Sequence, residues 1–337
     1  MTSDSSTFSP TDTARSSSTT IPSGDRWDVI IIGGGAAGLS AALILARARR
    51  RVLVLDGGQP RNRFAPHMHG VLSRDGYSPL DLVNDGYREV RSANGVIRTA
   101  RVVETRSSDG GFDVVTESGA VESAHRLIVA TGARDVLPSI PGLSEQWGRG
   151  VVACPYCDGY EAKGRAVGVL LGSAAGVHKA HMILPYSPDV TVFTALSGPL
   201  PVDDRRLLEH RGVRLEDRAV SRVVVDADRL TGLALDDGTV VPLDVVFAEP
   251  AFAPLDDPLR QLGADRVDTP MGQCVEVDAF GRTSVAGVWA VGNAVNPGAL
   301  VPIAMGAGAT AALTVNGEII AEEVATASAA LAEVRRG

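Results

Sequence analysis

The chain has 337 residues and a formal net charge of −8, and 45% of its residues are hydrophobic. This length exceeds one ordinary hydrophobic core and predicts two domains of a soluble globular protein. The acidic balance argues against a nucleic-acid partner, whose phosphates require a basic surface, and no apolar run approaches the length that spans a membrane.

Residues 1–25 are rich in Ser and Thr and lack the apolar centre of a signal peptide. They are predicted to form a disordered tail. The chain has three cysteines, which are too few for a disulfide-stapled secreted scaffold, and we expect a cytoplasmic protein.

After this tail the sequence predicts a strand, a glycine-rich turn, a helix and a second strand. The mostly apolar run 28–32 is typical of a buried parallel strand, the turn 33–38 follows at once, and 39–50 is expected to be helical. A second apolar run, 52–55, ends in Asp56. This order is the fingerprint of a dinucleotide-binding unit, and the alternative is a glycine-rich turn in an unrelated βαβ unit.

Each glycine of the turn has a physical role in a dinucleotide-binding unit. Gly33 allows the tight turn, Gly35 lets the backbone approach a pyrophosphate at the helix N-terminus, and Gly38 permits close packing of helix and strand. Asp56 can accept hydrogen bonds from a ribose. The predicted nucleotide-binding residues of this segment are Gly33, Gly35, Ala36, Ala37, Gly38, Asp56 and Gly57.

Two cysteines separated by two residues, Cys154 and Cys157, lie near the middle of the chain. Such a pair can form and reopen a disulfide, because its first thiol usually has a lowered pKa and its second thiol resolves the mixed disulfide. The alternative is half of a zinc site, which needs a second pair of Cys or His ligands. The remaining cysteine of the sequence, Cys274, has no His pair at ligand spacing near it. The pattern therefore favours a redox pair and predicts no metal site.

Two later segments repeat the theme of a strand followed by glycine. Residues 126–133 predict a strand that ends in a small-residue turn, and 287–293 predict another. A helix is expected at about 302–324, and its first turns are rich in Ala and Gly, which allows the close approach of a bulky ligand.

In this combination the sequence resembles the low-molecular-weight thioredoxin reductases and their relatives among the FAD-linked disulfide oxidoreductases. The resemblance covers about 28–325 and rests on the turn 33–38, on 130–132 and on 292–293, with the cysteine pair between the last two. It implies an α/β fold of two nucleotide-binding, Rossmann-like, three-layer domains, the second inserted in the first. The implied limits are 26–146 and 254–325 for a discontinuous FAD-binding domain, 147–253 for an NADPH-domain-like insert that carries the cysteines, and 326–337 for a C-terminal tail whose Ala-rich sequence is compatible with an extension of the last helix.

The resemblance implies FAD as the cofactor, with its ribityl and pyrophosphate groups near Gly292 and Asn293. The family usually has Asp after that glycine; Asn293 removes a charge but can still donate and accept hydrogen bonds, so we expect FAD binding to survive. Polar residues after the second strand lie where the family wraps the adenosine and approaches the flavin, and the alternative is that they are surface residues. The implied cofactor contacts of these segments are Gln59, Arg61, Asn62, Ala130, Thr131, Gly132, Gly292 and Asn293.

The insert begins a second βαβ pattern at 167–171, the unit that binds NADPH in thioredoxin reductases. Here Ala174 replaces the middle glycine of the turn and Val177 replaces the small closing residue. Their side chains are expected to crowd the pyrophosphate and the helix–strand packing. The segment 194–198, after the next predicted strand (190–193), carries no basic residue to hold a 2′-phosphate. The insert is therefore predicted to keep the fold but to bind NADPH poorly or not at all.

Two branches of the family fit such an insert. The dithiol oxidases of natural products such as gliotoxin and holomycin oxidise small dithiols and pass electrons to oxygen, and another branch takes electrons from ferredoxin. Asp158, directly after the pair, matches the acid–base residue of thioredoxin reductases, whereas the dithiol oxidases commonly carry His there; an alternative role for Asp158 is a helix cap. We hypothesise that Cys154 meets the substrate, that Cys157 faces the flavin and that Asp158 carries the proton.

The favoured function is an FAD-dependent dithiol/disulfide oxidoreductase and, within that class, a thiol oxidase that converts a small dithiol to a disulfide with oxygen as acceptor. One alternative is a thioredoxin reductase-like enzyme that reduces a protein disulfide with NADPH or ferredoxin, and another is a non-catalytic flavoprotein that senses redox state. His67 or His69 is a candidate base near the substrate, although a structural role is favoured for both. The family resemblance implies a homodimer.

Overall fold

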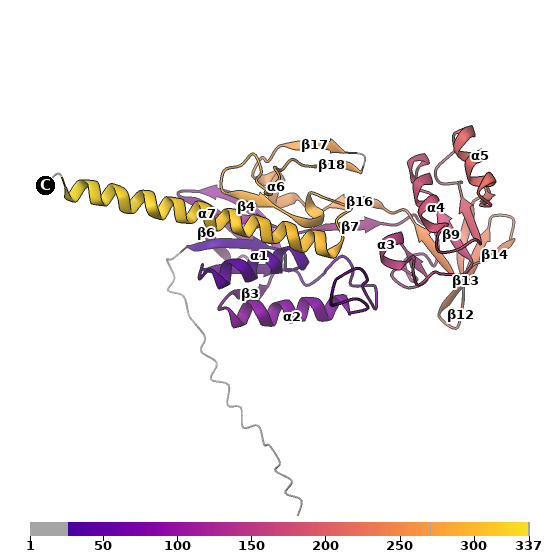
Figure 1. The fold of residues 1–337 in the computed structure, drawn as a ribbon, viewed down its shortest axis with the longest axis horizontal. Coiled ribbons are helices and arrows are strands. Elements are labelled where there is room, and N and C mark those ends of the chain that lie inside the picture. Colours follow the sequence, from indigo (N-terminus) through magenta and orange to yellow (C-terminus); the bar gives the residue numbers. More distant parts are fainter. Residues whose placement is uncertain (1–25, 270, 336–337) are drawn as a thin grey trace, which may run out of the picture.

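The computed structural model describes residues 26–269 and 271–335. The predicted disordered tail, 1–25, lies outside these residues. Within them the chain forms two large sheets that are joined by a narrow pair of strands (Figure 1).

The first sheet has seven strands, and β1 (Trp27–Ile32) lies at its centre between β2 (Val52–Asp56) and β6 (Val121–Val129). All three run parallel, and β3 (Val96–Thr99) and β19 (Val288–Ala290) extend this parallel part. The outer strands β4 (Val102–Ser108) and β5 (Gly111–Thr116) are antiparallel. The apolar run of β1 follows from this central place, because side chains on both of its faces are buried.

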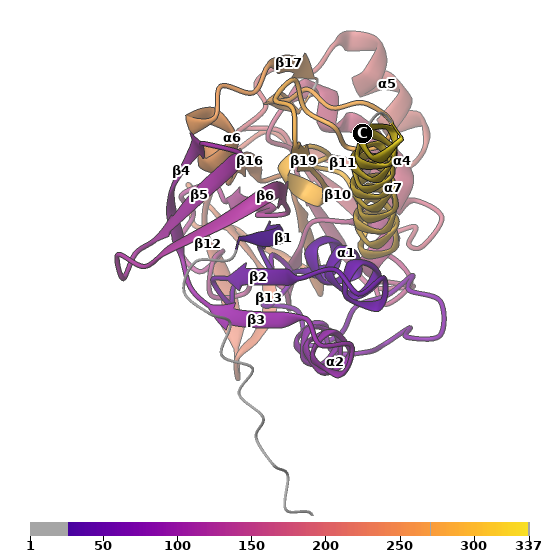
Figure 2. The same ribbon diagram turned by 90° about the vertical axis from the view of Figure 1, so that its left-hand side faces the viewer.

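Helices cover one face of the first sheet, and a smaller group of elements covers the other (Figure 2). Side chains such as Ile31 pack against α1 (Ala36–Arg47) and α7 (Val301–Val334), with α2 (Pro79–Ser92) beside α1. Side chains that point the opposite way, such as Ile30, pack toward α6 (Asp257–Gln261) and the hairpin of β17 (Arg266–Thr269) and β18 (Gly272–Val275).

Two glycines let α1 pack closely against its neighbours. A Cβ on Gly38 would collide with the carbonyl oxygen of Gly33, so only glycine permits this approach of helix and turn. A Cβ on Gly308 of α7 would collide with the carbonyl oxygen of Ala37 on α1. Small residues at the start of α7 therefore allow this helix to pack closely on α1.

The second sheet has five parallel strands in the order β11, β10, β9, β15, β8. Its bounds are β8 (Val151–Val152), β9 (Val167–Leu170), β10 (Val190–Phe193), β11 (Arg214–Glu216) and β15 (Val245–Ala248). One face packs on α4 (Val177–Ile183) and α5 (Val202–His210). The other packs on an antiparallel sheet of β12 (Val220–Asp226), β13 (Arg229–Leu235) and β14 (Val240–Pro242), which makes a third layer.

Two strands carry the chain between the sheets. β7 (Ala133–Val136) leaves the first sheet, and β16 (Ala251–Pro254) returns to it as the antiparallel partner of β7 (Figure 1). The first sheet thus takes its strands from both ends of the chain and the second from the middle. The predicted α/β class with Rossmann-like parallel sheets is confirmed, while the domain limits given above stay a prediction.

The last helix is longer than predicted. α7 continues to Val334, through most of the segment 326–337 that the sequence suggested was a tail, and residues 321–335 are exposed. By length and composition alone α7 could cross a membrane, so the expectation that no apolar run reaches that length is wrong for this helix. One such helix is weak evidence of a membrane, because a core helix passes the same test, and α7 packs along α1 as far as Ile319.

Candidate active site

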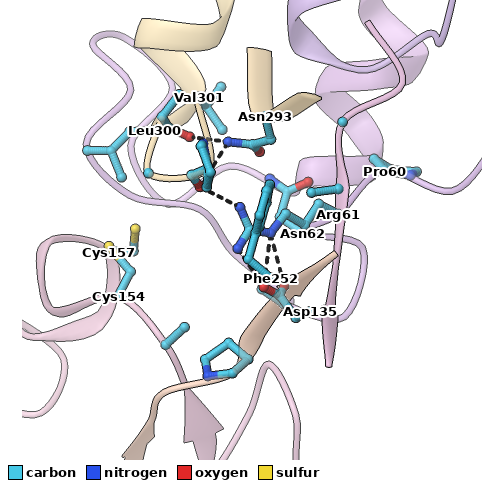
Figure 3. Close-up of a pocket in the computed structure, with 18 of the residues that line it drawn as sticks. Pro60, Arg61, Asn62, Asp135, Cys154, Cys157, Phe252, Asn293, Leu300 and Val301 are labelled. Carbon is cyan, nitrogen blue, oxygen red and sulfur yellow. Dashed lines mark hydrogen bonds and ion pairs between the residues drawn. The ribbon is translucent and has the colours of Figure 1, made fainter. Parts of the chain in front are cut away.

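A cavity of about 1310 Å³ opens at the carboxyl ends of β1 and β6 and extends to the cysteine pair of the insert (Figure 3). Open parallel sheets bind ligands at this edge, because glycine turns and helix N-termini meet there. Cys154, Cys157 and Asp158 line the cavity. The predicted cofactor residues that also line it are Gly33, Gly35, Ala36, Ala37, Asp56, Gln59, Arg61, Asn62, Ala130, Thr131, Gly132, Gly292 and Asn293. Gly38 lies beneath the turn and Gly57 is exposed, and neither borders the cavity.

The first glycine turn has the shape that a pyrophosphate needs. Gly33 has a φ of +106°, which favours glycine, and a Cβ there would collide with the carbonyl oxygen of Ala130. Gly35 is the N-cap of α1, and a Cβ built on it would meet no atom within 4 Å. The first amides of α1 therefore face open space at the cavity wall, where an anionic group is favoured.

Two polar groups beside this turn suit a bound dinucleotide. Asp56 ends β2, is buried, and accepts a hydrogen bond from the hydroxyl of Tyr87. The Oγ1 atom of Thr131 is buried and has no hydrogen-bond partner among the described residues. A buried hydroxyl without a partner is costly, and a ligand in the cavity would satisfy it. The residues present therefore fit FAD.

Arg61 joins three separate segments at the cavity wall rather than lying on the surface (Figure 3). Its Nε donates to Asp135 Oδ2 of β7 at 3.0 Å, and its Nη1 donates to the carbonyl oxygen of Pro297 at 2.8 Å. Its guanidinium also lies over the ring of Phe252 of β16, 5.7 Å from the centroid. The reading of Arg61 as a free surface residue is therefore wrong.

Asn293 shapes the loop that follows the second glycine signal. Its side-chain nitrogen donates to the carbonyl oxygens of Asn296 at 3.0 Å and Ala299 at 3.0 Å. These donors are thus used within the protein, although the sequence led us to expect them to serve the cofactor directly. The short 3₁₀ turn Gly292–Ala294 places this loop next to Arg61.

The cysteine pair stands on the short helix α3 (Pro155–Asp158), with Cys154 as its N-cap and Pro155 at its first position. Both cysteines are free thiols. A hydrogen bond from the Cys157 thiol, helped by the backbone N–H groups of Cys157 and Tyr156, lowers the pKa of Cys154 to about 7 against the opposing effect of burial. The same hydrogen bond and burial raise the pKa of Cys157. Near neutral pH, Cys154 is therefore the nucleophilic thiolate and Cys157 keeps its proton.

Asp158 directly follows the pair, and its pKa is raised. Burial and the neighbouring Glu161 raise the pKa of Asp158 to about 6, while His69 acts in the opposite direction. His69 lies between two carboxylates, with Nδ1 3.5 Å from Asp75 and Nε2 3.5 Å from Glu161. It therefore links the loop after β2 to the segment after the cysteines, and it lines the cavity with His67.

Sequence reasoning missed several lining residues that come from the insert. Lys179 of α4 donates from Nζ to the carbonyl oxygen of Ala248 at 2.8 Å, and burial lowers its pKa. Met182 and Leu196 add apolar surface. No local motif marks these residues, because only the tertiary fold brings α4 to the cysteine pair.

The second glycine turn departs from expectation in one respect. Val177 is buried in the core of the insert with Ala180 and Ile183, so the predicted crowding of helix and strand by Val177 is wrong. Ala174 begins a 3₁₀ turn, Ala174–Gly176, and is half-buried. Thr194, at the end of β10, donates to Asp217 at 2.6 Å. No cluster of three or more metal-ligating side chains occurs in the part of the chain that the structure describes.

Comparison with known proteins agrees with this geometry. The family model described as pyridine nucleotide-disulphide oxidoreductase matches residues 27–308. Thioredoxin reductase sirT of Leptosphaeria maculans is 32% identical over 321 residues, which are 90% of this chain and 97% of that protein. Thioredoxin reductase tcpT of Claviceps purpurea is 31% identical over 284 residues, 79% of this chain and 86% of that protein.

Solved structures show the same relationship. The crystal structure of HlmI superposes with a TM-score of 0.86 at 42% identity and covers 92% of this chain and 97% of its own. An oxidoreductase from Agrobacterium tumefaciens superposes with a TM-score of 0.82 at 36% identity, covering 88% of this chain and 99% of its own. Proteins of this family are FAD-binding flavoproteins that act on thiols and disulfides, which confirms the predicted cofactor. The chain therefore belongs to the pyridine nucleotide-disulphide oxidoreductases and is a thioredoxin reductase-like, FAD-binding enzyme of that family.

Proposed function

We propose that this enzyme is a thiol oxidase, which converts a small dithiol to a disulfide and passes the two electrons to oxygen. The observation that carries the proposal is the pairing of an intact, polarised cysteine pair with an insert in which the arginines beside β10 and β11, namely Arg205, Arg214 and Arg218, are all held in ion pairs. The first part provides the thiol chemistry. The ion-paired arginines disfavour binding of NADPH, the usual electron donor of a reductase.

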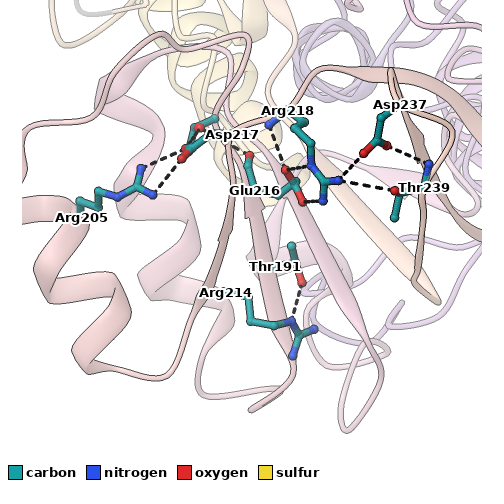
Figure 4. Close-up of polar contacts among 9 residues, drawn as sticks. Thr191, Arg205, Arg214, Glu216, Asp217, Arg218, Asp237 and Thr239 are labelled. Atoms are coloured by element: carbon teal, nitrogen blue, oxygen red, sulfur yellow. Dashed lines mark hydrogen bonds and ion pairs between the residues drawn. The ribbon is translucent and has the colours of Figure 1, made fainter.

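The arginines next to the carboxyl ends of β10 and β11, where the adenosine of a nucleotide would lie, are held in ion pairs (Figure 4). Arg205 donates to both oxygens of Asp217, at 3.0 and 2.8 Å. Arg218 donates to Glu216 at 2.6 Å and to Asp237 at 2.6 Å. A 2′-phosphate needs charge-assisted hydrogen bonds from an unpaired guanidinium, and at this edge it would also meet three carboxylates.

The cysteine pair determines the order of the thiol steps. With the pair oxidised, a substrate thiolate attacks the sulfur of Cys154, the Cys154–Cys157 bond breaks, and Cys157 leaves with the bonding electrons and takes up a proton. The second substrate thiol then attacks the mixed disulfide, and the substrate leaves as a disulfide while Cys154 leaves as thiolate. The low pKa of Cys154 makes it a good leaving group in this second step.

Asp158 is suited to carry the protons of these exchanges. Its pKa of about 6 lets it accept a proton from an incoming thiol near neutral pH and return it to Cys157, whose pKa is raised. Bound FAD supplies the two-electron acceptor that restores the disulfide of the pair. The balance of the cycle is one dithiol and one oxygen molecule converted to one disulfide and one hydrogen peroxide.

The cavity supports a small substrate. Its volume of about 1310 Å³ exceeds that of ordinary ligand pockets, which are roughly 300–1,000 Å³, so a cofactor and a second small molecule can share it. The apolar side chains of Met182, Leu196 and Phe64 line this cavity together with Cys154 and Cys157.

A thioredoxin reductase-like reaction is the second candidate. Tyr156 and Tyr160, on either side of Cys157, are 69% and 74% exposed, and large exposed aromatic side chains suit contact with a protein disulfide. The names of the relatives also favour this reaction for those proteins.

The test is oxygen consumption and hydrogen peroxide release with dithiothreitol as a model dithiol. We expect turnover by the wild type and loss of at least about a hundredfold in C154S and C157S, since both exchanges need both sulfurs. C274A is the matched control, because Cys274 is buried and does not border the cavity. Turnover that survives in C154S and C157S would contradict the proposal, and turnover only with NADPH and a protein disulfide would favour the reductase.

A further inference from the structure

The glycine turn of the insert holds a carboxylate of its own chain. Glu249 directly follows β15, which is the strand beside β9, so its side chain lies at the edge where the turn after β9 begins. Glu249 Oε2 accepts hydrogen bonds from the backbone nitrogens of Gly172 at 2.9 Å and Ser173 at 3.2 Å. A Cβ on Gly176 would collide with the same oxygen.

These backbone N–H groups belong to the first two residues of the turn, next to the place where a strand–turn–helix unit normally holds a phosphate. The two glycine turns of this chain can be compared directly. In the first turn, a Cβ on Gly35 would meet no atom within 4 Å, and the space is open for an anion. In the second turn, a carboxylate that belongs to the protein lies against Gly172, Ser173 and Gly176, on both sides of the middle position, Ala174.

Among residues 26–269 and 271–335, no ion pair cancels the charge of Glu249. The charge of Lys179 interacts with that of Glu249, but the Lys179 ammonium donates to the carbonyl oxygen of Ala248, at 2.8 Å. Farther along the same edge, the hydroxyl of Thr194 and the guanidinium of Arg205 both donate to the carboxylate of Asp217. These donors are therefore also occupied by an acidic side chain of the protein, and Figure 4 shows the pair of Arg205 and Asp217. A diphosphate that entered the turn would lose the N–H donors to Glu249 and meet its negative charge at close range.

We propose that Glu249 is the residue that excludes dinucleotides from the insert, by occupying the diphosphate position of the turn. The proposal rests on the proposed function, because an enzyme that takes electrons from dithiols gains by refusing a nicotinamide donor. The side chain of Val177 is accommodated in the core, so the residue that blocks a dinucleotide is Glu249, directly after the neighbouring strand β15.

The test measures binding of ADP, a probe with a diphosphate and no nicotinamide, to the FAD-loaded protein by titration calorimetry at low salt. E249A removes the carboxylate, and we expect it to bind ADP at least about tenfold more tightly than the wild type. E249Q keeps the shape and loses the charge, and we expect a smaller gain. A174G/E249A, which also restores the middle glycine, should gain the most.

D244A is the matched control. Asp244 precedes β15 as Glu249 follows it, and its Oδ2 accepts from the backbone nitrogen of Ala166 at 2.9 Å, at the opposite edge of the sheet. D244A removes the same charge and the same kind of bond, and its affinity for ADP should stay that of the wild type. The FAD content and melting temperature of each variant establish that it is folded, and E249Q serves as the test if E249A is not.

ADP affinity in E249A and A174G/E249A that does not exceed that in D244A would overturn the proposal. Because binding is read without turnover, this outcome leaves the dithiol oxidase assay intact. Conversely, failure of that assay would not alter the ADP result, so the two proposals can fail separately.

Discussion

The thiol of Cys157 donates a hydrogen bond to the sulfur of Cys154, and this contact makes the two cysteines chemically unequal. The acceptor becomes the thiolate near neutral pH, and the donor keeps its proton. The lower pKa therefore makes Cys154, the cysteine that forms the N-cap of α3, the better leaving group of the two sulfurs.

Removal of the donor should weaken this asymmetry. In C157A the pKa of Cys154 should rise from about 7 toward that of a free thiol, about 8.5, and alkylation by iodoacetamide at pH 7 should slow roughly tenfold. C157S is the matched control, because its hydroxyl can still donate, and its alkylation midpoint should stay closer to 7. The rate of alkylation as a function of pH, with the modified site identified by mass spectrometry, checks this. An unchanged midpoint in C157A would show that the backbone donors alone lower the pKa.

The pH profile of turnover should contain the ionisation of Asp158. Because burial and Glu161 raise the pKa of Asp158 to about 6, this carboxyl is protonated below pH 6 and can accept a proton only above it. The rate of dithiol oxidation should therefore rise with pH through about 6, and D158N should lose this limb and roughly a hundredfold in rate. E161Q removes one cause of the raised pKa, so its limb should move to lower pH. A D158N profile identical to that of the wild type would rule out the proton-carrying role.

Arg61 should control retention of FAD through the loop around Pro297. R61A removes charge-assisted hydrogen bonds that join this loop to β7, each worth about 1.5–3 kcal/mol, and FAD should dissociate at least about tenfold more readily. R63A is the matched control, since Arg63 donates to the nearby Pro60 carbonyl at 3.2 Å and lies over Phe64, both close to it in sequence. Fluorescence of released FAD measures the effect. Equal release in R61A and R63A would mean that the Asp135 contact is dispensable.

Gly308 should be required for the packing of α7 on α1. G308A places a methyl group against the backbone of Ala37, and overpacking of this kind costs about 1–3 kcal/mol or more. G317A, in the same helix but exposed and with no atom near its added Cβ, should be neutral or stabilising by up to about 1 kcal/mol. Denaturant unfolding of the two FAD-loaded variants checks the difference. Equal stability of G308A and G317A would show that α7 can shift without cost.

Local patterns in the sequence were sufficient to predict the first nucleotide unit. The strand, turn, helix and second strand around Gly33 depend on residues close in sequence, and the structure places them at Trp27–Ile32, Ala36–Arg47 and Val52–Asp56. The cysteine pair and Asp158 were equally predictable, since the spacing of the two cysteines is typical of a redox pair.

Contacts between distant segments were not predictable in this way. Arg61 meets Asp135 and Pro297 only because two loops converge on β7, and Glu249 meets Gly172 only because β15 lies beside β9. Val177 was expected to crowd the packing of helix and strand, but it is buried in the core of the insert with Ala180 and Ile183. Contacts of this kind depend on the packing of the whole insert, so local patterns in a single sequence do not predict them.

The most direct test of the central claim is anaerobic reduction of the bound flavin. FAD-loaded enzyme with oxidised cofactor is mixed in one sample with NADPH and in another with dithiothreitol, and the absorbance of the flavin is followed. The proposed oxidase predicts bleaching by the dithiol and none by NADPH over the same time. Rapid bleaching by NADPH would contradict the account and assign the enzyme to the NADPH-dependent reductases.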